Sequence, residues 1–480
     1  MSDSNPLSER QERASIDASC RVPVLTMYAS GVFWLVIGSL FALIASFKLH
    51  NPEFLASDAA TTFGRIRTAH LMAVIFGWAC TAGFGTALWL FSRLCRVPLR
   101  MPNLVLAAGV LWNIGVFVGI TAILAGNTTS IEWLEFPTYA AFILFISFAL
   151  IGIWTIEMFL NRKTGHIYVS LWYLTAALFW FPWLYATVQL MLILKPVQGS
   201  TQGIIHWWFA HNVLGLWFTP IGLATAYYMI PKVLGRPIYS YWLSILGFWS
   251  QALFYNWNGS HHLIGGPVPA WIITIGVVAS IMMVVPVVTV AINHHMTMKG
   301  HFHLLKYSPT LRFVVFGAMA YTLSSLQGSS MAIRSLNRVT HFTHYTVGHA
   351  HLGMYAFFTM IMFGAMYYII PRLIGWEWPS AKLISIHFWM TALGVTLMFL
   401  SLSIGGIVQG LALEDPKVPF MATISYTLPF LLTRSISGIM ITVGHIAFAI
   451  LFVMMLTRRG EERTEPTLFS EIPETQSERS

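Results

Sequence analysis

Apolar runs long enough to cross a bilayer recur along almost the whole chain, and they restrict the fold more than any other feature. A membrane-crossing helix needs about 20 apolar residues. Hydropathy identifies runs of this kind at residues 25–48, 68–94, 102–126, 136–160, 167–195, 203–230, 240–263, 269–293, 310–333, 344–370, 382–410 and 432–456. Only 9% of the residues are charged, against roughly 25% in soluble domains. The sequence therefore predicts an all-α membrane protein with about twelve transmembrane helices.

Basic residues are concentrated in the loops after the even-numbered spans. These loops hold Arg93, Arg96, Arg100, Arg162, Lys163, Lys232, Arg236, Lys299, Lys306, Arg312, Arg372, Lys382, Arg458 and Arg459. The positive-inside rule places them and both termini in the cytoplasm. Topology, and not nucleic-acid binding, thus explains the net charge of +9. We expect a cytoplasmic segment at 1–24 with no cleaved signal peptide, one membrane domain at 25–457, and a disordered cytoplasmic tail at 458–480.

Histidine placement carries most of the chemical information, because ionisable residues are costly inside spans and mark functional sites. One set, interpreted as solvated residues of a cytoplasmic loop, is His294, His295, His301 and His303. A second set, interpreted as isolated core residues with hydrogen bonds, is His166, His387 and His445. The candidates that remain lie toward the outer ends of four spans: His70, His206, His211, Tyr255, His261, His262, His349 and His351. Side chains at one level on several helices are what a cofactor inside a helix bundle requires.

His349 and His351 are two positions apart on one predicted helix, so their side chains point roughly 200° apart. They cannot bind the same metal, but they can serve two haems on either side of the helix. His70 can complete the coordination of one iron, while the other iron keeps an open face for a small ligand. The pair His261 and His262, with one more imidazole, would suit copper. The alternative for this pair alone is a hydrogen-bonded cluster at a span end.

Four segments resemble the haem-copper oxidase superfamily, and specifically the catalytic subunit of cbb3-type cytochrome c oxidase. They are FGRIRTAH at 63–70, HWWFAHNVLGLWFTPIGLATAYY at 206–228, YNWNGSHH at 255–262 and MAIRSLNRVTHFTHYTVGHAHLG at 331–353. The resemblance covers the membrane domain and implies the haem-copper oxidase subunit I fold. It implies two b-type haems and one copper ion.

The resemblance also implies a role for each candidate residue. His70 and His351 are similar to the ligands of the low-spin haem b, and His349 to the ligand of the high-spin haem b. The implied copper ligands are His211, His261 and His262. Tyr255 corresponds to the family's redox-active tyrosine, and the resemblance implies that it is covalently cross-linked to His211.

The implied enzyme is a terminal oxidase of the bacterial inner membrane. It would reduce dioxygen to water with electrons from c-type cytochromes, coupled to proton uptake and proton pumping. Splitting the dioxygen bond takes four electrons. Iron and copper supply most of them, and a phenol would donate the remaining electron. This chain has no motif for a c-type haem, so we expect membrane-anchored c-type cytochrome subunits as partners.

A proton path is expected below the site, on the sixth and seventh spans. Its residues, similar to the family's single uptake path, are Thr219, Tyr227, Tyr241 and Ser244. Hydroxyl groups with water can carry protons at lipid depth. Ordinary hydrogen bonding between helices is the alternative for each of them.

Four arginines near span ends on the outer face depart from the charge pattern: Arg65, Arg67, Arg334 and Arg338. Guanidinium groups bind carboxylates in a bidentate manner, so we expect Arg65 and Arg338 to contact haem propionates. Anchoring among lipid headgroups is the equal alternative.

The chain departs from the family pattern at two positions, with His344 in place of Asp and Gln327 in place of Glu. The polar contacts around the high-spin haem are expected to differ accordingly. The family's calcium-binding glutamate lies in a Glu-aromatic-Pro run, and here both Glu132 and Glu135 fit it. The choice between them stays open.

Three alternative functions remain, one catalytic and two non-catalytic. A nitric oxide reductase of the same superfamily would carry a glutamate at the position of Gly215 and would lack the tyrosine, since a carboxylate ligand favours iron over copper. A secondary transporter or a dihaem cytochrome b would be non-catalytic, and a transporter would show no haem absorbance.

Overall fold

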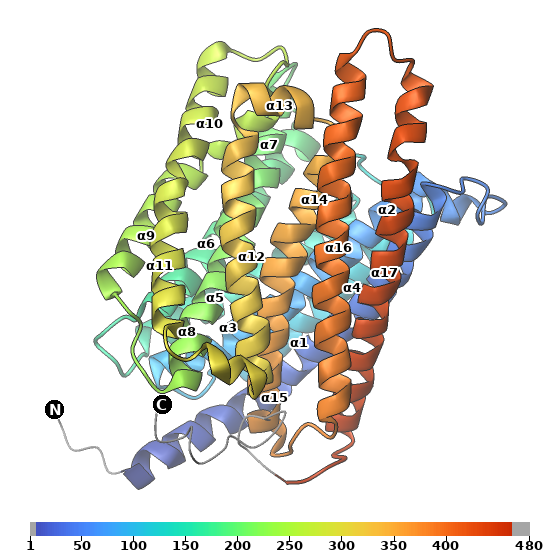
Figure 1. Ribbon diagram of the computed structural model, residues 1–480. Coiled ribbons are helices and arrows are strands. Elements are labelled where there is room, and N and C mark those ends of the chain that lie inside the picture. Colours follow the sequence, from blue (N-terminus) through green and yellow to red (C-terminus); the bar gives the residue numbers. More distant parts are fainter. Residues whose placement is uncertain (1–5, 463–480) are drawn as a thin grey trace.

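The computed structural model describes residues 6–462, which form a bundle of long helices (Figure 1). Its α-helices are α1 (Pro6–Lys48), α2 (Phe63–Met72), α3 (Cys80–Cys95), α4 (Pro102–Leu124), α5 (Thr138–Leu160), α6 (Val169–Val188), α7 (Thr201–Val213), α8 (Thr219–Leu234), α9 (Tyr241–Tyr255), α10 (Ala270–Met282), α11 (Val284–Met298), α12 (Pro309–Met331), α13 (Arg334–Thr340), α14 (His344–His351), α15 (Met360–Ile374), α16 (Ala381–Glu414) and α17 (Phe420–Leu456). The π-helices are η2 (Ala73–Ala79), η3 (Gln189–Leu194), η4 (Leu214–Phe218) and η7 (Leu352–Thr359), and the 3-10 helices are η1 (Ala59–Thr61), η5 (Asn258–Leu263) and η6 (Phe302–Lys306).

Every apolar run identified in the sequence is helical, so the prediction of an all-α membrane protein is confirmed. Within the described residues, 10 helices are long and apolar enough to cross a membrane. The two predicted spans outside this set are α9, which has only 15 residues before η5 follows, and α12, whose last turns carry serines and Gln327. Both helices pack beside α11.

At both ends of the chain the structure describes part of the segments expected to flank the membrane domain. Helix α1 begins at Pro6, so the segment before the first span is the first part of the same helix. Residues 458–462 belong to the expected tail, and one of them, Glu462, forms an isolated β-bridge with Trp376. The rest of the predicted tail lies outside the described residues.

Three ligand-bearing helices change into π-helices directly after the histidines that the sequence singled out. Helix α2 continues as η2, α7 as η4 and α14 as η7. A π-helical turn has a wider hydrogen-bonded ring than an α-turn, and such turns recur at functional sites. Each π-helical turn therefore rotates the histidine-bearing segment about the helix axis relative to the part of the helix that follows it.

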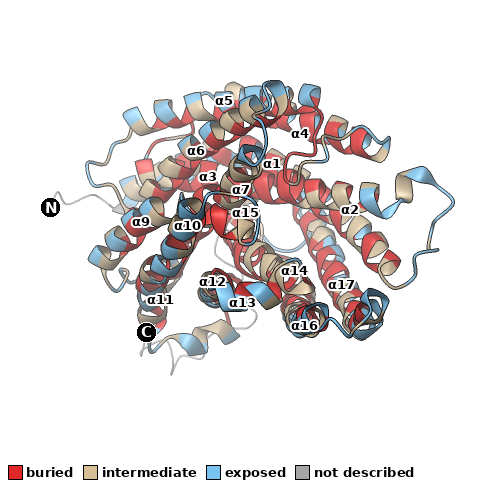
Figure 2. Ribbon diagram, turned by 90° about the horizontal axis from the view of Figure 1, so that it is seen from above, coloured by how far each residue is buried: buried red, intermediate tan, exposed pale blue. Residues whose placement is uncertain are grey.

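Buried and exposed faces separate cleanly around the bundle. Viewed from above, the buried faces point to the centre around α3, α7 and α15, and exposed residues follow the rim (Figure 2). The exposed side chains there include large apolar ones such as Phe117 and Phe142, as a lipid-facing belt requires. Helices α2, α7 and α14 lie in the upper half of Figure 1, which we call the ligand end. The opposite end, where Arg93, Lys232 and Lys299 lie, is the basic end.

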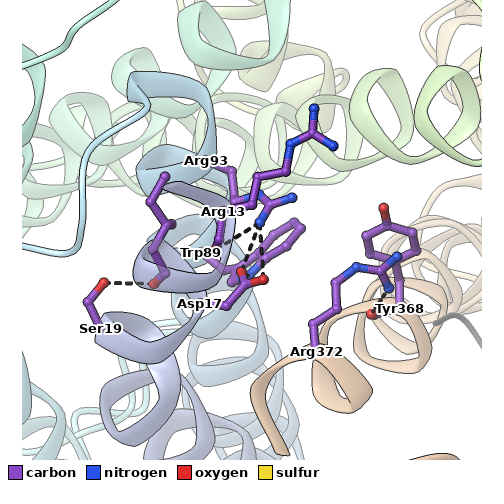
Figure 3. A network of polar contacts seen from close by, with 8 residues as sticks. Arg13, Asp17, Ser19, Trp89, Arg93, Tyr368 and Arg372 are labelled. Carbon is purple, nitrogen blue, oxygen red and sulfur yellow. Dashed lines mark hydrogen bonds and ion pairs between the residues drawn. The ribbon is translucent and has the colours of Figure 1, made fainter. Parts of the chain in front are cut away.

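A polar network ties the start of α1 to α3 at the basic end (Figure 3). Arg93 Nη1 lies 3.1 Å from both carboxylate oxygens of Asp17, and Trp89 Nε1 donates to the same carboxylate at 2.8 Å. The two charged side chains are only 8% and 15% exposed. Close by, the guanidinium of Arg372 stacks 3.6 Å above the ring of Tyr368. Because the pair is largely shielded from water, loss of either partner would strand a buried charge.

Candidate metal centre

One cavity at the ligand end collects most of the residues that the sequence singled out. Its volume is about 410 Å³. The ligand-type side chains on its wall are His70, His211, Tyr255, His261, His262, His344, His349 and His351. They come from α2, α7, α9, η5 and α14. His206 is not among them, because its Nε2 is paired with the backbone oxygen of Glu132 at 2.9 Å.

His211, His261 and His262, here called the three-histidine cluster, have the spacing of a metal site. Each offers one ring nitrogen, and these atoms lie within 4.8 Å of one another. The Nδ1 atom of His261 is 2.8 Å from the hydroxyl of Ser280, and the ring of His262 stacks on Trp207 at 3.9 Å. His211 Nδ1 is buried and has no hydrogen-bond partner among residues 6–462. Three imidazoles held by their neighbours are a donor set that fits copper.

Two glycines allow η5 to lie between α7 and α10. A Cβ atom at Gly259 would stand 2.2 Å from the backbone oxygen of Trp207, and one at Gly276 would stand 2.1 Å from the hydroxyl oxygen of Ser260. Both distances are far shorter than any real Cβ contact. Any larger residue would push η5 away and separate its two histidines from His211.

Tyr255 lies against the three-histidine cluster, with its ring centroid 4.7 Å from that of His211. The space that it occupies exists because residue 215 is glycine. A Cβ atom at Gly215 would lie 1.8 Å from Cε1 of Tyr255. In the sequence, Gly215 and Tyr255 are two separate indications against a nitric oxide reductase. In the structure the two residues contact each other.

In each predicted haem ligand, the Nδ1 atom lies within hydrogen-bond distance of an oxygen atom of another residue. His70 Nδ1 is 2.9 Å from the carbonyl oxygen of Gly38, and His351 Nδ1 is 2.8 Å from that of Val347. A carbonyl oxygen can only accept, so the proton is on Nδ1 and Nε2 keeps its lone pair. His349 Nδ1 lies 3.3 Å from Oε1 of Gln327, which is the position where the family pattern has glutamate. These imidazoles fit iron ligation through Nε2.

Neither of the two predicted propionate arginines, Arg65 and Arg338, lines the cavity. Arg338 pairs with Glu414, and its side chain is 74% exposed. Arg65 donates to the backbone oxygen of Leu124 at 3.1 Å and lines a separate pocket. Arg67 and Arg434 line the main cavity instead. Sequence reasoning missed Arg434, although an arginine inside an apolar run is itself a functional signal.

The structure distinguishes Glu132 from Glu135. Glu132 forms an ion pair with Arg67 at 2.7 Å. Glu135 is only 3% exposed, and its Oε2 has no partner within the described part of the chain. Burial raises the pKa of Glu135 to about 7. Oε2 of Glu135 is therefore free to bind a cation, whereas Glu132 is already paired with Arg67.

The predicted path residues lie between the basic end and the cavity, in different settings. Thr219 lines the cavity. The Tyr241 hydroxyl donates to the backbone oxygen of Ile167 at 2.7 Å, and Ser244 donates to that of Tyr241 at 2.6 Å. These two bonds agree with the alternative of ordinary helix hydrogen bonding.

Two further polar side chains extend the same region. Asn293 Nδ2 lies 3.5 Å from the hydroxyl of the fully buried Tyr227. Tyr321 lines the cavity, and its buried hydroxyl has no partner among the residues described. Sequence reasoning missed both, because a single polar residue in a span is common.

The histidines set aside earlier have different outcomes. His387 and His445 are core residues with hydrogen bonds, to Tyr367 at 2.8 Å and to Tyr355 at 2.6 Å respectively. The interpretation as a solvated loop is wrong for His294, which lies in α11 and is 4% exposed. Helix α11 continues past the expected end of its span, and the extra turns pack against α8 and α9.

Comparisons with known proteins agree with this geometry. Residues 22–440 match the family described as Cytochrome C and Quinol oxidase polypeptide I. The chain is 32% identical over 435 residues to the cbb3-type cytochrome c oxidase subunit CcoN1 of Stutzerimonas stutzeri, which covers 87% of this chain and 91% of the relative. It is 31% identical over 453 residues to the bacteroid cytochrome c oxidase subunit 1 homolog of Bradyrhizobium diazoefficiens, covering 90% and 82% of the two chains.

The fold is also that of a solved relative. A cryo-EM structure of a haem-copper terminal oxidase dimer superposes with a TM-score of 0.72 at 16% identity, covering 95% of this chain and 86% of that one. The predicted haem-copper oxidase subunit I fold is therefore confirmed. The chain belongs to the cytochrome c and quinol oxidase polypeptide I family of oxidoreductases, and within it to the cbb3-type cytochrome c oxidase subunits.

Proposed function

We propose that this chain is the catalytic subunit of a terminal oxidase that reduces dioxygen to water with electrons from c-type cytochromes. His70 and His351 hold a low-spin haem b, His349 holds a high-spin haem b, and the three-histidine cluster holds a copper ion. When bound, these groups supply electron transfer and the reduction of dioxygen. All of their proposed ligands line one cavity.

The contact between Tyr255 and Gly215 carries this proposal against the nitric oxide reductase alternative. A glutamate at position 215 would have its Cβ 1.8 Å from the tyrosine ring. The tyrosine and the glutamate therefore exclude each other sterically. The residues present leave an all-imidazole donor set, which favours copper over non-haem iron.

The chain's own side chains have separate tasks in this reaction. Tyr255 supplies a proton and an electron from its phenol, and its position beside His211 supports the expected cross-link. Gln327 orients His349 through Nδ1, and Ser280 orients His261 in the same way. Such outer partners fix the ring orientation of a metal ligand.

Protons are taken up from the basic end, which we assign to the cytoplasm by the positive-inside rule. Hydroxyl groups at Tyr241, Ser244, Tyr227 and Thr219 form the path, and Tyr321 connects it to the cavity wall. The same path would serve proton pumping. Both ends of the chain would then lie in the cytoplasm.

Residues near the cavity support two further assignments. Arg67 and Arg434 are the proposed propionate contacts, because they line the cavity. Glu135 is the proposed calcium ligand, because it is buried and its Oε2 has no hydrogen-bond partner within residues 6–462. Membrane-anchored c-type cytochrome subunits in the bacterial inner membrane would deliver the electrons.

Metal and haem analysis of the purified complex tests the proposal. We expect copper, two b-type haems, a carbon monoxide shift in the reduced spectrum, and dioxygen consumption with reduced cytochrome c. Iron in place of copper, with nitric oxide reduction and no dioxygen consumption, would support the reductase. Haem without any carbon monoxide shift would indicate a dihaem cytochrome b, and absence of haem absorbance would indicate a transporter.

A further inference from the structure

His294 is a buried titratable residue that the proposed reaction does not yet use. It lies on α11 near the basic end and is 4% exposed. Its ring packs 4.6 Å from the ring of Tyr227, at an angle of 62°. Both of its ring nitrogens are buried, and neither has a hydrogen-bond partner among residues 6–462.

Two unpartnered nitrogens on one buried imidazole call for a physical cause. A neutral imidazole always has one N–H donor and one acceptor nitrogen, and leaving both unsatisfied costs free energy. Ordered water is the usual partner of such buried groups. An imidazole that is hydrogen-bonded to water at both nitrogens can accept a proton at one nitrogen and release the proton of the other.

Further unpartnered groups continue from His294 toward the cavity. Tyr173 stacks on Tyr227 at 6.0 Å, and its buried hydroxyl has no partner in the described part of the chain. Tyr321 has the same property and lines the cavity with Thr219. Water that satisfies these groups would form a line from the basic end to the metal centre.

The helices packed on α11 carry no other imidazole and no carboxylate. The elements packed on α11 are α8, α9, α10 and α12. Their titratable and charged residues are Tyr227, Tyr228, Lys232, Tyr241, Tyr255, Arg312 and Tyr321. None of these helices carries Asp or Glu, and on α11 itself the other candidate is His295, which is half-buried and bonded to the Ala291 oxygen at 2.8 Å.

We propose that His294 is the residue that passes protons from the basic end to the water beside Tyr227. This inference rests on the proposed dioxygen reduction, which consumes protons at the cavity. A proton from water on the basic side binds one ring nitrogen, and the proton on the other nitrogen leaves to water next to Tyr227. A half-turn of the ring then restores the first tautomer, with no net oxidation or reduction.

The test compares His294→Gln and His294→Gly with the matched control His295→Gln in the purified complex. Glutamine keeps hydrogen bonding but cannot exchange a proton. We expect His294→Gln to lower dioxygen consumption on the order of a hundredfold, with the haem spectrum and carbon monoxide shift unchanged. The pH profile of its remaining activity should differ from that of the wild type. Added imidazole should restore activity to His294→Gly, and His295→Gln should resemble the wild type.

The outcomes separate this inference from the function on which it rests. Wild-type turnover and pH profile in His294→Gln would overturn the inference. Loss of haem in both His294 variants, without rescue by imidazole, would show a structural role and would also overturn it. A wild-type complex that consumes no dioxygen would instead refute the proposed function.

Discussion

Replacing Gly215 with alanine tests whether the site depends on the close approach of Tyr255. The added Cβ would lie 1.8 Å from Cε1 and 2.0 Å from Cδ1 of the ring. Carbon atoms settle at about 3.5–4.0 Å, so the ring must retreat by roughly 2 Å. Overpacking of this kind costs about 1–3 kcal/mol of stability, which a large membrane bundle tolerates. A misplacement of about 1 Å at a reacting group costs on the order of a hundredfold in rate.

We therefore expect Gly215→Ala to retain both haems and to lose most dioxygen consumption, because Tyr255 moves away from His211. The assay is oxygen uptake with reduced cytochrome c, normalised to haem content from the reduced spectrum. Mass spectrometry of the peptide containing Tyr255 reports the expected cross-link. Gly152→Ala is the control, since nothing lies within 4 Å of its added Cβ. Wild-type turnover in Gly215→Ala would refute the steric argument.

Three other changes probe separate parts of the structure. Ser280→Ala removes a hydroxyl that orients one imidazole of the three-histidine cluster at 2.8 Å, and we expect copper affinity to fall about 10–100-fold, measured by metal content after dialysis. Burial raises the pKa of Glu135 to about 7, so its carboxyl is neutral below that pH and stabilisation by calcium should be lost as the pH falls through it. Without calcium the pH dependence of stability has the opposite sign. The folded protein favours the neutral carboxyl, so the contribution of Glu135 to the free energy of unfolding decreases as the pH rises. Thermal unfolding with calcium or chelator checks this, and Glu135→Gln should abolish the calcium effect while Glu132→Gln retains it. Arg93→Ala breaks an ion pair whose side chains are 8% and 15% exposed, so we expect a loss of about 3–5 kcal/mol in unfolding experiments, whereas Arg13→Ala at an exposed pair should change little.

The sequence alone determined the features that depend on short stretches of chain. The transmembrane segments could be predicted because a bilayer requires each of them to be apolar and internally hydrogen-bonded. The opposite directions of His349 and His351 follow from helix geometry within one turn. The candidate ligands could be recognised because histidine is rare and costly at lipid depth.

Tertiary structure decided everything that depends on which neighbours a residue meets. Arg434 of α17 lines the cavity, whereas Arg338 pairs with Glu414 and is largely exposed. His294 is buried because α11 continues past the expected span and packs on α8 and α9. Gly215 and Tyr255 are distant in sequence, so their mutual fit was visible only once η4 and α9 lay side by side. Burial and contact are properties of assembled surfaces, and no single segment of the sequence contains them.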